Sequence, residues 1–409
     1  MTDPGARAAD RLAQLAGLSA PGPGVTRLPF TEHHRAALDL LRGWMEGAGL
    51  QVRLDDAGTL IGRLDGPEGA PTFLMGSHQD SVREGGAYDG IMGVVLPLLA
   101  LERLRAEGVR LPFTVEILAF ADEEGVRFPT ALLGPRALAG TVDMGVLDMQ
   151  DADGVTLRAA MEGFGLHPDA IPGLARPPAG IIGYLETHIE QGPVLERAGQ
   201  ALGVVTAICG IERHPITVTG QTGHAGTLPM EGRRDALVGA AALVAEVHRL
   251  AQSTDGLLGT VGYLEVAPNA VNAVPREVRL TAEFRSADDA VRDGGGAALH
   301  RFAAALADRS GLGIDIRRSY AQPAQPCDAA LSDRLETAIR DQGGAGLRLA
   351  SGATHDASAM ADLCPVAMLF VRCRDGLSHT PAEHADPADM GAAVTAIVAV
   401  LKGLAGARR

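Results

Sequence analysis

The chain has 409 residues, 46% hydrophobic and 21% charged, which is typical of a globular protein with about two domains. A formal net charge of −14 and an aromatic content of 3% argue against nucleic-acid binding, and four cysteines without a CxxC pair exclude a disulfide framework. Without a signal-peptide pattern or an apolar run approaching ~20 residues, we expect a soluble, cytoplasmic protein with small-molecule partners, no nucleic acid and no membrane.

The first part of the chain alternates helical and strand patterns. Helical periodicity covers residues 8–18 and 33–48. Residues 72–75 and 113–121 are short apolar runs typical of buried strands, and a largely apolar helical stretch, residues 90–107, separates them. Strand, helix and strand with polar residues at the strand ends predict an α/β sheet with a site at its carboxyl edge.

The middle of the chain has a different pattern. Residues 216–219, 257–266 and 278–285 alternate apolar and polar side chains, as half-exposed strands do. Helical segments cover residues 235–250 and 297–308. This order predicts a small α+β domain with one open sheet face.

A Pro-rich segment, residues 322–326, leads back to the first kind of pattern. A helix over 331–340, a buried strand over 366–371 and a last helix over 386–404 follow it. The chain is therefore predicted to be a catalytic α/β domain interrupted by a smaller inserted domain. The expected boundaries are 1–211 and 328–409 for the catalytic domain and 212–327 for the inserted domain.

Four groups of polar residues follow the predicted strands. They are His78 with Asp80 and Asp89, the run Asp122-Glu123-Glu124, His188 with Glu190, and the segment Ser378 to His384. Each group has an ordinary explanation, such as a helix N-cap at Asp89 or a solvated acidic turn. Adjacent carboxylates repel one another unless a cation is present, however, and Asp80 could orient the imidazole of His78. Together the groups supply imidazoles and carboxylates suited to divalent metals and to a two-metal hydrolase.

The segments that carry these groups resemble the M20-type metal-dependent amidohydrolases, in the hydantoinase/carbamoylase branch. The matching segments are GSHQDSVREGGAYDGIMGV, FADEEGVRFPTALLGPRALAG, LETHIEQGPVLERAG, GHAGTLPMEGRRDAL, PNAVNAVPREV with FRS, SGATHDAS and DGLSHTPAEH. They run from about residue 76 to about residue 384. The HIEQGP and GHAGTLPM segments distinguish this branch from related aminoacylases and peptidases.

The resemblance implies a binuclear centre with two divalent ions per subunit, zinc or manganese. The implied ligands are His78, Asp89 as the bridging carboxylate, Glu124, His188 and His379. Glu123 matches the general base, and His224 matches a histidine that stabilises the oxyanion. Gln191, Asn272, Arg285 and Gly376 match substrate contacts, of which Arg285 would clamp a carboxylate with its bidentate guanidinium.

The resemblance also implies a fold and an assembly. The inserted domain would be a ferredoxin-like lid that also makes a homodimer, with His224 reaching the active site of the partner. We expect hinge motion near residues 211 and 327 to bring Arg285 and Asn272 to the site of their own subunit.

The implied activity is hydrolysis of a ureido (N-carbamoyl) C–N bond in a small carboxylate-bearing substrate. Allantoate is favoured because DEEGVRF and LLGPRALAG resemble allantoate hydrolases, which release ammonia and CO2. N-carbamoyl-L-amino acid hydrolase and β-ureidopropionase are close alternatives, and an aminoacylase or dipeptidase is a more distant one. A non-enzymatic binding protein is disfavoured because Glu123 and all five ligand matches are present. Departures from the family pattern leave the exact substrate open; they are Ser81, Pro135, Thr354 and Ile211-Glu212.

Overall fold

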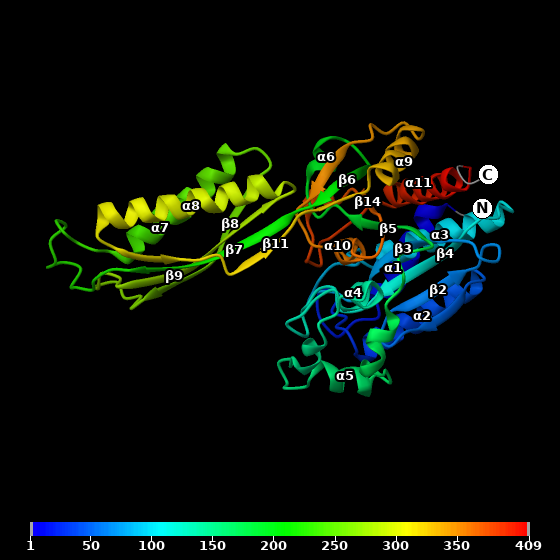
Figure 1. Ribbon diagram of the computed structural model, residues 1–409, viewed down its shortest axis with the longest axis horizontal. Helices are drawn as coiled ribbons and strands as arrows, with labels where there is room; N and C mark the ends of the chain where they lie inside the picture. The colour runs from blue at the N-terminus through cyan, green and yellow to red at the C-terminus, as the bar shows by residue number, and fades with distance from the viewer. Residues whose placement is uncertain (1–2, 407–409) are drawn as a thin grey trace. The chain divides into compact units, whose positions relative to one another are not determined.

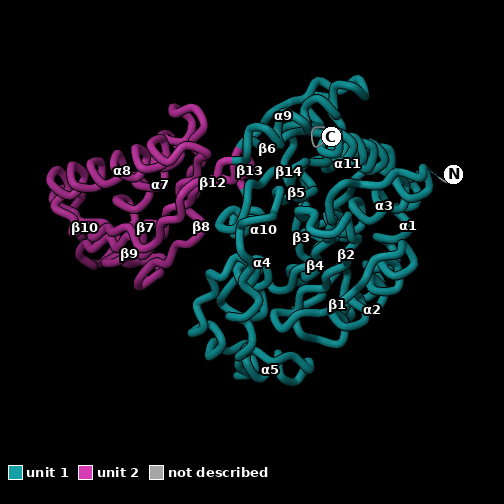
Figure 2. The backbone as a smooth tube through the Cα atoms, turned by 45° about the vertical axis from the view of Figure 1, so that its right-hand side comes forward, with its two compact units in different colours: residues 1–206, 327–349, 353–409 teal, residues 207–326, 350–352 magenta. Residues whose placement is uncertain are grey.

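The computed structural model describes residues 3–406, which form two compact units (Figures 1 and 2). The first unit holds the described residues up to Thr206, Cys327–Leu349 and those from Ala353 onward. The second unit holds Ala207–Pro326 and Ala350–Gly352. The second unit is thus an insertion that also includes three later residues, Ala350–Gly352.

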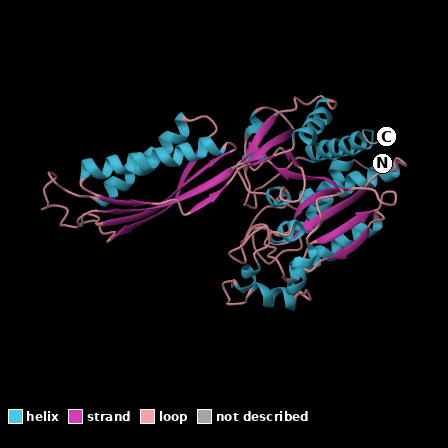
Figure 3. Cartoon of the chain, viewed as in Figure 1, coloured by secondary structure: helices cyan, strands magenta, loops and turns pink. Residues whose placement is uncertain are grey.

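The first unit is built on a mixed sheet, whose strands are magenta in Figure 3. The strand order is β1-β2-β4-β3-β5-β14-β6, with β12 and β13 pairing with β6. The strands of this sheet are β1 (Gln51–Leu54), β2 (Leu60–Leu64), β3 (Thr72–His78), β4 (Thr114–Phe120), β5 (Ile181–Ile189), β6 (Leu202–Ile208), β12 (Gln325–Pro326), β13 (Arg348–Ser351) and β14 (Val366–Val371). Strand β12 itself belongs to the residues of the second unit. The four central strands β4, β3, β5 and β14 are parallel. The predicted mixed α/β fold is confirmed.

Helices cover this sheet. They are α1 (Pro4–Ala16), α2 (Glu32–Gly47), α3 (Met92–Ala106), α4 (Leu133–Ala139), α5 (Leu157–Gly163), α6 (Val194–Arg197), α9 (Ala329–Arg340), α10 (Asp356–Met360) and α11 (Pro387–Gly406). Strands β4 and β14 are buried at every position, which explains why their sequences are continuous apolar runs rather than alternating ones. The core of the unit therefore lies on both faces of the parallel strands.

Helix α11 corrects one expectation. This helix of 20 residues is long and apolar enough to cross a membrane, and its most apolar part has a mean hydropathy of 1.6. Most of that part is buried inside the protein, and α11 packs against α1, α3, α9 and β14. Its apolar character is therefore that of a core helix, because it is covered on several sides by its own chain.

The second unit is an antiparallel sheet in the order β10-β7-β9-β8, with β11 also paired with β7. The strands are β7 (Gly210–Thr219), β8 (Leu258–Ala267), β9 (Glu277–Ser286), β10 (Gly313–Ile316) and β11 (Tyr320–Gln322), and the helices are α7 (Ala236–Ser253) and α8 (Asp289–Ser310). Alternate residues of β9, from Val278 to Phe284, are buried against these helices. The other side chains of β9 line a polar face of the sheet.

Candidate active site

The parallel strands deliver the predicted site residues to one edge of the sheet. His78 is the last residue of β3 and lies in register with Phe120, the last residue of β4. Only Ala121 separates Phe120 from the run Asp122-Glu123-Glu124. His188 lies near the end of β5, and the segment with His379 follows β14. Because parallel strands share their carboxyl edge, residues far apart in sequence meet here.

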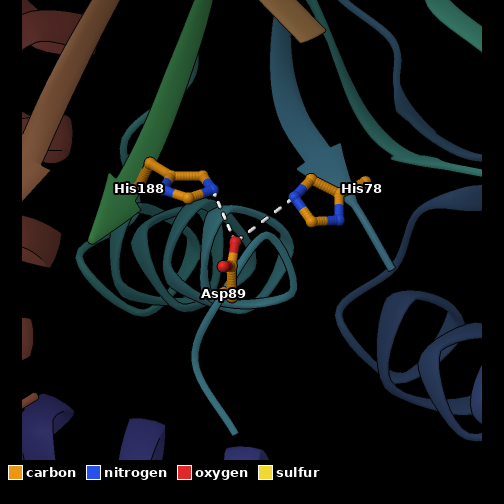
Figure 4. A group of neighbouring side chains, drawn as sticks. All are labelled: His78, Asp89 and His188. Atoms are coloured by element: carbon orange, nitrogen blue, oxygen red, sulfur yellow. Dashed lines mark ion pairs between the residues drawn. The ribbon is translucent and has the colours of Figure 1, made fainter. Parts of the chain in front are cut away.

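Asp89 lies between the ends of these strands. Helix α3 begins at Met92, and its N-cap residue, Ile91, makes no side-chain capping bond, so Asp89 is not the helix cap that a simpler interpretation would make it. Asp89 Oδ1 lies 3.0 Å from His188 Nε2 and 3.5 Å from His78 Nε2 (Figure 4). All three side chains are buried. They form the first group that could hold a cation.

The tautomers of both histidines follow from their hydrogen bonds. His78 Nδ1 lies 3.0 Å from the main-chain oxygen of Asp80, and His188 Nδ1 lies 2.9 Å from that of Ile189. A carbonyl oxygen only accepts, so Nδ1 carries the hydrogen of each neutral ring and Nε2 presents a lone pair. Lone pairs on Nε2 and on the Asp89 carboxylate therefore face one another, an arrangement that is favourable only with a proton or a cation between them.

Asp80 contacts the His78 imidazole, as expected, through its main chain. Its main-chain oxygen, rather than its carboxylate, receives the His78 hydrogen, because the carboxylate oxygen lies 3.9 Å from Nδ1. The carboxylate instead accepts the main-chain N–H groups of Glu123 and Glu124, both at 3.2 Å. Asp80 therefore fixes both the His78 imidazole and the main chain at Glu123 and Glu124.

A second group shares Asp89. His379 Nε2 lies 3.3 Å from Asp89 Oδ2 and 3.8 Å from Glu124 Oε2. Asp89, Glu124 and His379 each offer a ligand atom within 4.8 Å of the others. All five predicted ligands are thus brought together in two groups with Asp89 in common.

Glu123 lies beside the first group. It is buried, and its Oε2 is 3.9 Å from His78 Nε2. Burial raises the pKa of Glu123 well above its usual range, and the carboxyl groups of Glu124 and Asp356 raise it further. Burial likewise raises the pKa of Glu124 to about 7. The excess of buried carboxylate is what a divalent cation would compensate, so the donor set fits a metal centre.

Gln191 approaches Asp89 from the end of β5. Its Nε2 donates to Asp89 Oδ2 at 2.8 Å, while its Oε1 is buried without a hydrogen-bond partner among the described residues. Gln191 and His379 both have positive φ, 56° and 57°. Non-glycine residues rarely adopt this conformation, and it is concentrated at functional sites.

Gly376, one of the predicted substrate contacts, has φ +65° in a turn against another segment. A Cβ at this position would lie 2.7 Å from the carbonyl carbon of Gly192. The glycine therefore allows close packing of two loops beside the site.

A third set of possible ligands consists of Glu186, His188 and His355. Both oxygens of Glu186 are already used, because Oε1 accepts from Ser77 Oγ at 2.7 Å and Oε2 from the main-chain N–H of Ala357 at 2.8 Å. His355 packs against His188 edge to face, with ring centroids 4.5 Å apart. This layer supports His188 from behind. Sequence reasoning gave it no role, although Thr354-His355-Asp356 lies in one of the family-like segments.

The remaining predicted residues lie in the second unit, at opposite ends of its sheet. His224 and Asn272 are exposed on adjacent loops, joined by the Ala225 N–H donating to the Asn272 carbonyl at 2.9 Å. The His224 loop follows Thr219, the end of β7, and the Asn272 loop precedes Glu277, the start of β9, which pairs with Thr219. Arg285 lies at the other end of this strand pair, opposite Ile211. From Glu277 to Arg285 is eight residues of strand, about 27 Å.

Residues 74–403 match Peptidase family M20/M25/M40. The chain belongs to this family. It is 39% identical to an N-carbamoyl-L-amino acid amidohydrolase from Geobacillus stearothermophilus, over 94% of this chain and 95% of that protein. It is 36% identical to allantoate deiminase from Arabidopsis thaliana, over 96% of this chain and 81% of that protein.

Among solved structures, an amidase of the hydantoinase/carbamoylase family from Burkholderia multivorans superposes with a TM-score of 0.92 and 34% identity, covering 98% of both chains. The predicted membership of the M20 amidohydrolases, in the hydantoinase/carbamoylase branch, is confirmed. This M20 protein is therefore an enzyme, a hydrolase of C–N bonds.

Proposed function

We propose that this enzyme hydrolyses a ureido C–N bond in a small carboxylate-bearing compound, using two divalent metal ions per subunit. The observation that carries the proposal is the meeting of five predicted ligands around Asp89, with Glu123 beside them. The names of the relatives, N-carbamoyl-L-amino acid amidohydrolase and allantoate deiminase, support the ureido group as the target.

His78 and His188 would hold one ion, and Glu124 and His379 would hold the other. Asp89 would contribute to both sites. When bound, such ions polarise the ureido oxygen and lower the pKa of the attacking water. Glu123 takes a proton from that water, and the water oxygen adds to the ureido carbon. Glu123 then gives the proton to the leaving nitrogen as the C–N bond breaks. The carbamate released decomposes to ammonia and CO2. The unpaired Gln191 Oε1 provides an acceptor for a ureido N–H.

Arg285 is arranged to receive a carboxylate. Its Nε donates to Glu283 Oε1 at 2.7 Å and its Nη1 donates to the Gly352 carbonyl at 2.7 Å. These bonds hold the guanidinium and leave one hydrogen on Nη1 and both on Nη2 to donate to a carboxylate. Binding of a carboxylate by Arg285 fits both allantoate, the substrate we favour, and N-carbamoyl-L-amino acids. The N-carbamoyl-L-amino acid amidohydrolases are at least as similar to this chain as the allantoate deiminase is.

The two ends of the second unit lead to a further part of the proposal. A small substrate held by Arg285 cannot also touch His224 or Asn272 of the same unit, because about 27 Å of strand separates the ends. We therefore propose a homodimer in which both His224 and Asn272 come from the partner. This corrects our expectation that Asn272 and Arg285 serve the same site from one subunit.

The second unit offers a surface for such a dimer. Strand β8 is at the edge of its sheet, where main-chain groups are unpaired, and it exposes Leu258, Tyr263 and Leu264. Val238, on α7, is 68% exposed. An unpaired edge beside exposed apolar side chains is suited to a two-fold interface, in which the same surface of each copy meets.

A substrate panel tests the activity. Purified enzyme, metal-depleted and reloaded with Mn²⁺ or Zn²⁺, is assayed for ammonia release from allantoate, N-carbamoyl-L-amino acids, 3-ureidopropionate and dipeptides. Turnover of a ureido compound that disappears with chelator supports the proposal, and cleavage of dipeptides alone would refute it.

Subunit exchange tests the composite site. Inactive Glu123→Gln and inactive His224→Ala subunits are mixed. If His224 acts across the dimer, each heterodimer has one site with both defects and one with neither, so activity partly returns. No recovery in verified heterodimers would exclude the composite site.

A further inference from the structure

The loop after His379 carries a buried carboxylate that the proposed mechanism does not use. Glu383 is 5% exposed, and its oxygens accept three hydrogen bonds. Oε1 accepts from the main-chain N–H of Tyr88 at 2.9 Å and of Asp89 at 3.0 Å. Oε2 accepts from the Ser378 hydroxyl at 2.9 Å. Glu383 thus ties the loop of one proposed ligand, Asp89, to the loop of another.

The contact is close enough to shape the Asp89 loop. A Cβ on Gly86 would lie 2.1 Å from Glu383 Oε1, so only glycine lets this loop approach the carboxylate. The same oxygen satisfies both N–H groups, and that of the buried Asp89 is kept from lying unpaired. The main chain at Asp89 is therefore fixed by Glu383 rather than by a helix cap.

Ser378 links the two carboxylates. Its Oγ lies 2.9 Å from Asp89 Oδ2 and 2.9 Å from Glu383 Oε2, and it accepts from Gln191 Nε2 at 3.2 Å. A hydroxyl has a single hydrogen, so it can donate to only one carboxylate at a time. Asp89 Oδ2 is the oxygen that faces His379 and Glu124 in the second ligand group. The same oxygen already accepts from Gln191 Nε2 at 2.8 Å, so the direction of the Ser378 hydrogen decides whether its remaining lone pair is free for a cation.

We propose that Glu383 is a positioning residue of the metal centre: it fixes the main chain at Asp89 and takes the Ser378 hydrogen, which leaves Asp89 Oδ2 to the second cation. This inference rests on the proposed function, because it needs a cation at Asp89.

Glu383→Gln is the informative change, because it keeps the size and reverses one hydrogen bond. The Gln oxygen must face the N–H groups of Tyr88 and Asp89, since an NH₂ group there would meet two donors. The Gln NH₂ then donates to Ser378 Oγ, and the Ser378 hydrogen must turn to Asp89 Oδ2 and compete with the cation. We expect the second Mn²⁺ to bind about 10–100-fold more weakly, as is usual when a partner of a metal ligand is changed, with a smaller effect on the first.

The experiment titrates metal-depleted protein with Mn²⁺ by calorimetry, without substrate. Glu196→Gln is the matched control, because Glu196 also accepts a main-chain N–H, from Asp375 at 2.9 Å, but has no hydrogen bond to Asp89 or Ser378. Glu383→Gln is then repeated in a Ser378→Ala background, where no hydrogen can be redirected. If the mechanism is right, the loss of affinity shrinks to less than about 3-fold there, as a double-mutant cycle detects for coupled residues.

The results separate this inference from the proposed function. The positioning role is supported if Glu383→Gln alone weakens the binding of the second Mn²⁺. Glu196→Gln must then bind as tightly as wild type, and Glu383→Gln in the Ser378→Ala background nearly as tightly as Ser378→Ala itself. Unchanged affinity, or an equal loss in the Ser378→Ala background, overturns it while leaving the two-metal proposal standing. A wild-type protein that binds fewer than two cations would overturn both.

Discussion

Gly90 lies against the imidazole of His78, and its substitution gives a sharp test of the metal centre. Gly90 has φ +65°, and a Cβ built on it would lie 2.3 Å from His78 Cε1 and 2.4 Å from Nε2. Gly69 has a similar φ of +72° but nothing within 4 Å of its Cβ position. Gly90→Ala and Gly69→Ala therefore share the backbone strain and differ in the collision with His78.

The expected size of the effect follows from these distances. Carbon atoms pack at about 3.5 Å, so the His78 ring must retreat by about 1 Å to admit the methyl group. Metal–ligand distances hold to about ±0.2 Å, so this displacement would remove His78 from the proposed first cation. Gly69→Ala costs only the left-handed conformation, about 1–2 kcal/mol.

Metal content and affinity are the assay. For Gly90→Ala we expect one Mn²⁺ per subunit to be lost after dialysis and the turnover rate to fall by about 10²-fold or more, as for an active-site displacement of about 1 Å. Gly69→Ala should keep both ions and the wild-type rate. Two ions bound to Gly90→Ala with wild-type affinity would refute the placement of His78 at a metal.

Three further predictions concern single side chains. Glu123→Gln should lower kcat by about 10²–10⁴-fold with metal content intact, because it removes the proton acceptor and leaves the ligands. Arg285→Lys should raise KM for a ureido carboxylate, because a point charge replaces the guanidinium. Asp55→Asn should remove a pH dependence of stability. Burial raises the pKa of Asp55 to about 6, so the folded wild type loses stability as pH rises through that value. Relative to wild type, the Asn variant should gain about 2 kcal/mol between about pH 4.5 and about pH 8.

Each of these has a contradicting outcome. Near-normal kcat in Glu123→Gln would remove it as the base. Equal wild-type activity on a decarboxylated analogue would show that Arg285 binds no carboxylate. A constant difference in unfolding free energy between Asp55→Asn and wild type across the pH range would show that Asp55 titrates normally. Asp55 Oδ2 is buried without a partner among the described residues, so an amide NH₂ in its place costs a fixed free energy. Comparing the two proteins at different pH values cancels this fixed cost.

The sequence predicted the parts of the fold that depend on local pattern. The apolar run 366–371 is β14, and the helical period over 386–404 is α11, which spans Pro387–Gly406. Helix α8 was predicted to start near residue 297 and starts at Asp289, because three glycines, residues 294–296, weaken the helical signal. Packing overrides propensity there: a Cβ on Gly296 would lie 2.0 Å from Glu212 Oε1, so the helix approaches β7 closely only with glycine.

The family-like segments gave the identity of the site residues, because ligand chemistry depends on residue type and strand-end position. Sequence alone therefore determined the family, the mixed α/β sheet and the set of side chains that meet around Asp89. Only the tertiary structure decided which atoms act. The main-chain oxygens of Asp80 and Ile189 set the tautomers of His78 and His188, and Ser378 shares one hydrogen between two carboxylates. It also decided that Arg285 and His224 lie at opposite ends of one sheet, because strand length and register, which no motif records, set the distance between them.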